Sequence, residues 1–195
     1  MQQQLDDLFA LIDKANSEDP VVEQDSSSEQ PRALLYGLRM STCQKSIAPE
    51  AGLELRIAAR AQHICRWQIA RDRYPQGRVG YLKWRRDLGG HHARLTAELM
   101  QSLNFDSAII ERVKHLLQKK NRTHDADTQS LEDIACLVFL KHYYEGLCSK
   151  HDAHKIISIL AKTWRKMSPK AQEFALKLDY PSQQQQLLDA ALAGH

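Results

Sequence analysis

Two imidazoles and one carboxylate stand out among the polar residues that interrupt the apolar stretches of this sequence. His63 lies in RAQHICRW, His92 in YLKWRRDLGGHHA and Asp133 in SLEDIACLVFL. Two imidazoles with one carboxylate can bind a first-row metal and leave positions open for water and substrate. Such a metal lowers the pKa of its bound water, which provides a hydroxide near neutral pH. We therefore expect His63, His92 and Asp133 as candidate ligands of manganese, iron, nickel or zinc.

Cationic and polar residues in the same stretches suit a phosphate group. Arginine presents its N–H groups in a fork that matches two phosphate oxygens, whereas lysine supplies a point charge. Glu132 would orient a ligand or a water beside Asp133, so these two carboxylates are the expected catalytic residues. The expected ligand-binding residues are Gln62, Arg66, Tyr81, Arg85, Lys119 and Lys120. The corresponding function is metal-dependent hydrolysis of a nucleotide or another phosphate ester.

Two other interpretations fit the same residues. A non-catalytic helical domain could bind a nucleotide, RNA or an acidic partner through a basic polar pocket, without a metal and with a steep dependence on salt. Alternatively, the polar groups could satisfy one another as a buried network that fixes helix packing. Mutations would then lower stability without affecting any ligand. The sequence leaves the three interpretations open.

The distribution of charge is uneven along the chain. Residues 1–30 hold eight acidic residues and one basic, whereas residues 56–94 hold ten basic residues and two acidic. Such asymmetry is typical of a surface or pocket that meets anions, and the acidic segment would be free to screen it. The alternative is that the arginines lie on solvated helix faces and in local ion pairs.

The elements that would position these residues are helical. Apolar residues recur at intervals of three and four, and β-branched residues are sparse, which predicts an all-α fold of about eight or nine helices. The expected helices cover 2–16, Pro31 to about Ile47, about 50–70, 81–103 with a bend or pause at Gly89-Gly90, 106–120, 128–147, 152–166, 169–178 and 183–193.

Helical spacing predicts which polar residues share a face. In the helix expected over 50–70, His63 lies on one face with Arg60 and Trp67, and Gln62 stacks over Arg66. RAQHICRW would then supply one wall of a polar site.

The two later stretches would supply the neighbours across this site. Tyr81, Arg85 and His92 face one direction if the glycine pair does not break their helix. Glu132 and Asp133 open a strongly apolar helix, so at least one of them should point inward. An inward carboxylate needs a metal, an arginine or a histidine as its partner.

The length of 195 residues suits one domain with its own core. We expect an N-terminal amphipathic helix at 1–22, a mobile acidic and serine-rich loop at 23–30, a helical core over 31–180, and a tail or weak helix at 181–195. Within this core, Ser168-Pro169 predicts a helix start, with serine as N-cap and proline at the first helical position.

No secretory signal and no apolar run of spanning length is evident, so no membrane partner is expected. The four cysteines are scattered without a CxxC pair, which indicates a reducing, cytoplasmic setting.

Several stretches together resemble an uncharacterised family, domain of unknown function 4202. The resemblance rests on ANSEDP (15–20), LLYGLRM (34–40), RAQHICRW (60–67), YPQGRVGYLKWR (74–85), HHA (91–93), LEDIACLVFL (131–140) and KTWRKMS (162–168). Members of this family occur in bacteria and fungi and are sometimes labelled glutamyl-tRNA synthetases. This sequence has neither a HIGH motif nor the parallel strands that such a label requires.

A more distant resemblance is to the HD superfamily of helical metal-dependent phosphohydrolases. It implies a possible HD-domain-like fold, with His63 as the first histidine, His92 as the histidine of the His-Asp doublet or an accessory one, and Asp133 as the last aspartate. The chain departs from the pattern at the doublet, because Ala93 follows His92.

Overall fold

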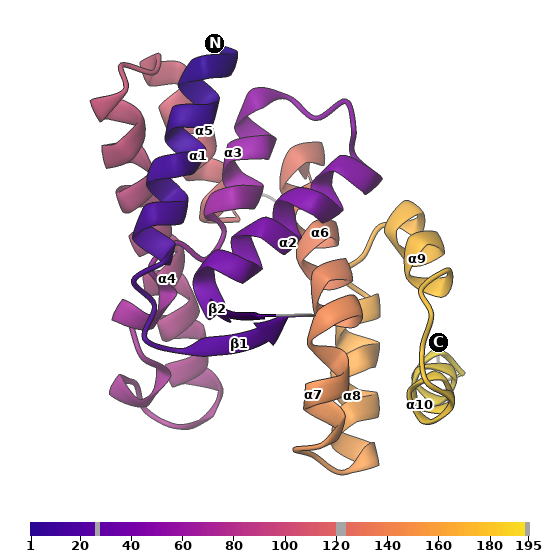
Figure 1. The fold of residues 1–195 in the computed structure, drawn as a ribbon. Coiled ribbons are helices and arrows are strands. Elements are labelled where there is room, and N and C mark those ends of the chain that lie inside the picture. The colour runs from indigo at the N-terminus through magenta and orange to yellow at the C-terminus, as the bar shows by residue number, and fades with distance from the viewer. Residues whose placement is uncertain (26–27, 120–123, 194–195) are drawn as a thin grey trace. The chain divides into compact units, whose positions relative to one another are not determined.

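The computed structural model describes residues 1–25, 28–119 and 124–193 and is predominantly α-helical, which confirms the expected all-α class (Figure 1). The chain divides into two compact units, Met1–Thr128 and Gln129–His195, where the sequence suggested one domain. The division falls inside helix α6 (Ala126–His142). In the described ranges, no helix combines the length and apolarity needed to cross a bilayer.

The first unit is a set of helices packed around α3. Its elements are α1 (Gln2–Asn16), β1 (Val22–Asp25), β2 (Ser28–Pro31), α2 (Arg32–Ile47), α3 (Leu53–Ala61), the 3-10 turns η1 (Arg66–Gln68) and η2 (Arg71–Arg73), α4 (Gly77–Ser102) and α5 (Ser107–Leu117). Helix α3 contacts α1, α2 and α5. Burial on so many sides explains why Ile57, Ala58 and Ala59 are all fully enclosed.

The loop expected over 23–30 differs from the structure, because β1 and β2 pair as an antiparallel hairpin. Two arginines of α2 hold the acidic side chains of β1. Arg32 contacts Glu23 at 2.9 Å, and Arg39 contacts Glu23 at 3.2 Å and Asp25 at 3.3 Å. These ion pairs link residues from two expected elements, which a local pattern of polar residues does not reveal.

Two residues of the ANSEDP stretch position the surrounding backbone. The Asp19 carboxylate accepts hydrogen bonds from the backbone N–H groups of Val21 (2.9 Å) and Ala33 (3.0 Å), so it satisfies a free donor in the first turn of α2. The Asn16 side chain is 1% exposed and accepts a hydrogen bond from the backbone N–H of Cys65 at 3.0 Å.

Two helix boundaries expected from the sequence were wrong. The helix expected over 50–70 ends at Ala61, so His63 does not share a helical face with Arg60 and Trp67. The helix expected from Tyr81 begins earlier, at Gly77, and runs through the glycine pair to Ser102 without a break. Flanking helical residues hold both glycines in the α conformation, because glycine lowers helix stability but does not forbid the helix.

The second unit contains most of α6, then α7 (Tyr144–Cys148), α8 (Ala153–Trp164), α9 (Pro169–Leu176) and α10 (Ser182–Leu192). Tyr144 is fully buried and donates a hydrogen bond to the carbonyl oxygen of Gln184 at 2.8 Å. Its ring meets the Tyr180 ring edge to face at 6.0 Å. Ser168 caps α9 as expected, because its hydroxyl oxygen accepts a hydrogen bond from the N–H of Ala171.

Candidate functional site

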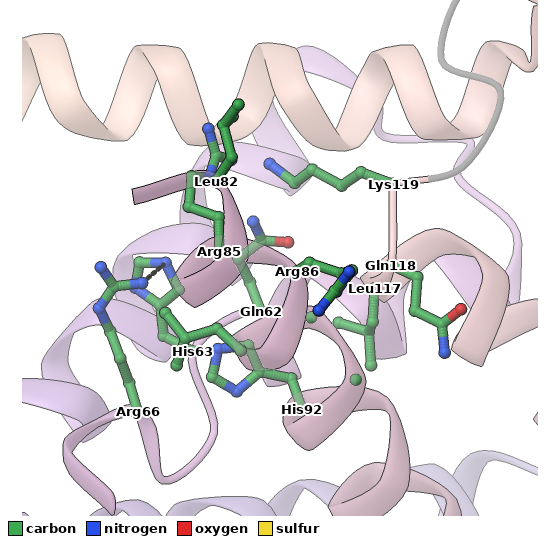
Figure 2. A pocket seen from close by; sticks show the side chains of 13 residues that line it. Gln62, His63, Arg66, Leu82, Arg85, Arg86, His92, Leu117, Gln118 and Lys119 are labelled. Atoms are coloured by element: carbon green, nitrogen blue, oxygen red, sulfur yellow. Dashed lines mark hydrogen bonds between the residues drawn. The ribbon is translucent and has the colours of Figure 1, made fainter. Parts of the chain in front are cut away.

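A pocket of about 670 Å³ opens in the first unit, a volume within the range of small-molecule sites. Three segments far apart in the sequence form its wall: the residues after α3, the middle of α4, and the end of α5 (Figure 2). The lining residues are Gln62, His63, Arg66, Leu82, Arg85, Arg86, Leu88, Gly89, Gly90, His92, Leu117, Gln118 and Lys119.

The first wall depends on a sharp turn that follows α3. Cys65 has a left-handed backbone with φ of 48°, which a non-glycine residue adopts only when its surroundings hold it. The hydrogen bond from its N–H to the Asn16 side chain supplies part of that hold. The turn places Gln62, His63 and Arg66 at the pocket, an arrangement that a continuous helix would not give.

His63 lies between an aromatic ring and a guanidinium. Its ring stacks on Tyr36 with the centroids 3.9 Å apart and the planes inclined by 16°. A guanidinium nitrogen of Arg66 lies 3.2 Å from His63 Nε2. Because arginine can only donate, His63 Nε2 is the acceptor. Burial, followed by the charge of Arg66, holds the pKa of His63 well below its usual value, so the imidazole is neutral.

His92 is oriented by the turn that carries His63. Its Nδ1 donates a hydrogen bond to the carbonyl oxygen of Ile64 at 2.8 Å, since a carbonyl can only accept. Burial lowers the pKa of His92 to about 3, so this imidazole is neutral as well. The two histidine rings lie 5.9 Å apart.

Two acceptors in the pocket wall are buried without a hydrogen-bond donor from the described part of the chain. They are Nε2 of His92 and Oε1 of Gln62, and their residues are 4% and 7% exposed. Buried polar atoms in native proteins nearly always have a partner, so each orphan requires an explanation. Figure 2 shows the Gln62 amide among the lining side chains.

The pocket wall is strongly cationic. Arg66 lies over the Trp84 ring at 4.7 Å, and Trp84 donates a hydrogen bond to the carbonyl oxygen of Ile69 at 2.9 Å, so both partners of this cation–π contact are oriented. Arg85 lies 6.0 Å above the Tyr81 ring. Arg85 and Arg66 have no carboxylate partner among the residues that the structure describes, and no described lining residue is acidic.

Most of the expected ligand-binding residues line the pocket. Gln62, Arg66, Arg85 and Lys119 all do, together with His63 and His92. Tyr81 does not line it and instead lies beneath Arg85. Lys120 falls outside the described residues.

Sequence reasoning missed five lining side chains: Leu82, Arg86, Leu88, Leu117 and Gln118. Leu82, Arg86 and Leu88 lie three or one positions from Arg85 on α4, so the helical spacing of three and four could have revealed Leu82 and Leu88. Leu117 and Gln118 close the end of α5, and nothing in their local pattern marks them as pocket residues.

The two carboxylates expected to be catalytic lie in the second unit, and both are buried. Asp133 accepts hydrogen bonds from the Ser168 N–H (2.8 Å), the Ser168 hydroxyl and the Gln129 side chain (2.8 Å). The inward position was therefore right, and the carboxylate accepts its hydrogen bonds from a serine and a glutamine, which were not among the expected partners. Glu132 contacts Lys166 at 3.6 Å.

The metal site of His63, His92 and Asp133 stays a prediction. Asp133 belongs to the second unit, whereas both histidines belong to the first. Across the described residues, no three His, Cys, Asp or Glu side chains form a group that could hold a metal ion.

Residues 6–188 match the family described as Domain of unknown function (DUF4202). The chain belongs to this family. Searches of curated proteins and of solved structures gave no match. The match extends over both compact units, so the pocket of the first unit and the Asp133–Ser168 contact of the second both lie within the family's span.

For this DUF4202 member, the arrangement favours recognition of an anion over proton transfer. Both pocket imidazoles are neutral, and one already accepts a hydrogen bond from Arg66. The guanidinium groups of Arg66 and Arg85 are held by aromatic faces, which leaves N–H groups for a ligand.

Proposed function

We propose that the first unit binds a phosphate-bearing small molecule, such as a nucleotide, in the cationic pocket. One observation carries the proposal: Arg66, Arg85, Arg86 and Lys119 line the pocket, and no described lining residue is a carboxylate. Such an excess of positive charge within one pocket attracts an anion and raises its local concentration. Arginine can bind two phosphate oxygens at once, which gives orientation as well as affinity.

The test measures binding of AMP and pyrophosphate by isothermal titration calorimetry at low and high salt. Arg85→Ala should weaken AMP binding roughly 10- to 100-fold, because hydrogen bonds to charged groups contribute about 1.5–3 kcal/mol. Arg94→Ala is the matched control. Arg94 lies on the same helix but does not line the pocket, and its guanidinium pairs with the Glu98 carboxylate at 2.8 Å. Absence of binding by both probes, or equal loss in the two variants, would contradict the proposal.

Metal-dependent hydrolysis of the bound ester remains a second prediction. It requires Asp133 to exchange its hydrogen bonds with Ser168 and Gln129 for a metal. Release of phosphate from AMP after addition of manganese, iron, nickel or zinc, lost in His63→Ala, would favour hydrolysis over binding alone.

A nucleic acid is the other expected partner, and its binding has a different signature. A polyanion that contacts several cations releases counterions, so its affinity falls steeply as salt rises. A single-stranded RNA oligonucleotide that binds without displacing AMP would indicate a surface beyond the pocket.

We infer a reducing, cytoplasmic setting for the protein. The support is that Cys43, Cys65, Cys136 and Cys148 are all free thiols, two of them buried. Cell fractionation of the tagged protein tests this inference.

A further inference from the structure

The orphaned acceptors of the pocket define what the ligand must carry besides its negative charge. His92 Nδ1 faces the Ile64 carbonyl and therefore holds the ring proton, so the buried Nε2 presents a lone pair. Gln62 Oε1 is likewise an acceptor that lacks a donor among the described residues. A fully deprotonated phosphate group cannot satisfy either atom, because both atoms accept hydrogen bonds and such a group has no hydrogen to donate.

The cations around these two atoms restrict the kind of donor that can reach them. Arg66 and Arg85 line the same pocket, as does Lys119. A ligand ammonium group would be repelled by this charge. A hydroxyl group donates a hydrogen bond without adding positive charge, so it is the donor that this pocket accommodates best.

The size of the pocket agrees with a ligand that has two parts. A volume of about 670 Å³ is far larger than a phosphate group needs and matches an organic molecule. In Figure 2 the Gln62 amide lies amid the lining residues, between the histidine pair and Lys119 in this view.

We propose that the ligand is a hydroxylated phosphate ester, of the sugar-phosphate or nucleotide kind, whose hydroxyl groups donate to Gln62 Oε1 and His92 Nε2 while its phosphate meets the arginines. This inference rests on the proposed binding of a phosphate-bearing molecule. It adds that Gln62 and His92 determine specificity by recognising the hydroxylated part.

The experiment compares glycerol 3-phosphate with propyl phosphate, which has the same charge and chain length but no hydroxyl group. Both are titrated by calorimetry at one pH above the second phosphate pKa of about 6. The protein should bind glycerol 3-phosphate roughly 3- to 10-fold more tightly for each hydrogen bond formed. AMP and ribose 5-phosphate, titrated in parallel, distinguish a nucleotide from a sugar phosphate.

Gln62→Met removes the acceptor and nearly preserves the length of the side chain. It should weaken glycerol 3-phosphate binding more than propyl phosphate binding and so remove most of the preference for glycerol 3-phosphate. Because Oε1 has no donor among the residues that the structure describes, the melting temperature should not fall. Gln101→Met, an exposed change on α4, is the matched control and should retain the preference.

His92→Asn provides a second, independent variant. The asparagine amide can keep the hydrogen bond to the Ile64 carbonyl, but it has no equivalent of Nε2. This variant should also lose preference for the hydroxylated ester.

The outcomes separate the two proposals. Equal binding of both esters by the unmodified protein overturns the hydroxyl inference and leaves phosphate binding standing. Absence of binding by inorganic phosphate, AMP and both esters overturns the proposed function itself. Equal weakening of both esters by Gln62→Met also overturns the inference, because it indicates a change of shape and not a lost acceptor.

Discussion

Asp133 illustrates how the role of a single residue depends on partners that are distant in the sequence. Its carboxylate accepts three hydrogen bonds from Ser168 and Gln129, so it connects α6 to the beginning of α9 within the second unit. The sequence indicated an inward carboxylate correctly. It could not indicate that a serine 35 positions away would supply the donors.

Asp133→Ala should therefore lower stability. The substitution leaves buried donors without an acceptor, which costs about 2–3 kcal/mol. Urea unfolding followed by circular dichroism measures the change, with Asp189→Ala, an exposed carboxylate of α10, as the control. Unchanged stability together with a lost metal would show that Asp133 is a metal ligand instead.

The pocket residues show how much of the candidate site the sequence could predict. Gln62, His63 and Arg66 were identifiable because polar groups inside an apolar stretch need partners. Their geometry was not, because the turn at Cys65 depends on Asn16, 49 positions earlier. Gln118 could not be found, since a polar residue at a helix end is ordinary.

At the scale of elements, helix periodicity predicted nearly all helices, but it did not locate all of their ends. Ser168 and its following proline gave the start of α9 correctly, because both signals are local. Helix α4 started four residues before its expected position, and its glycine pair did not interrupt it. The hairpin of β1 and β2 contacts α2 through ion pairs, which lie beyond the reach of local propensity.

The start of α6 has a cap whose strength should depend on pH. Asp125 Oδ1 accepts hydrogen bonds from the N–H groups of Asp127 and Thr128 at 3.1 Å, and its carboxylate also pairs with Arg112. The Arg112 hydrogen bonds hold the pKa of Asp125 well below its usual range. The unfolded chain therefore binds the proton more readily, so this stabilisation is complete above the unfolded pKa of about 3.9 and is lost as pH falls further.

Asp125→Asn should accordingly lower the free energy of unfolding at neutral pH by about 1.5–3 kcal/mol and flatten its decline in acid. Urea titrations over a series of pH values measure both effects. Asp106→Asn is the control, because Asp106 caps α5 through the Ala108 N–H and no ion pair of Asp106 occurs in the described ranges. Equal changes in the two variants would assign the effect to capping alone.

At the scale of the whole molecule, the acidic and basic parts of the chain are not independent. We expected the acidic segment, residues 1–30, to be free to screen the basic stretch, residues 56–94. That expectation was wrong for three of its acidic residues. Glu23 and Asp25 are paired with arginines of α2, and Asp13 is paired with Arg60. These contacts occupy acidic groups within the scaffold of the first unit, while Arg66 and Arg85 of the pocket have no carboxylate partner among the described residues.

Ligand binding should consequently slow the exchange of backbone amide hydrogens in the first unit. Hydrogen exchange with and without AMP should show slower exchange over 62–66, 80–92 and 117–119, because a bound ligand suppresses local opening. Arg85→Ala at the same AMP concentration should show no such protection. Protection confined to α8, α9 and α10 would place the ligand elsewhere.

The hydrogen bond between Asn16 and Cys65 also bears on the order in which the walls of the pocket form during synthesis. Synthesis proceeds at about 5–20 residues per second, so α1 is complete several seconds before the turn that it stabilises exists. Once residue 65 has emerged from the ribosome, the turn bearing Gln62 and His63 can form against α1 before α5 emerges. The pocket would then assemble from its N-terminal wall outward, and the end of α5 with Lys119 would join it last.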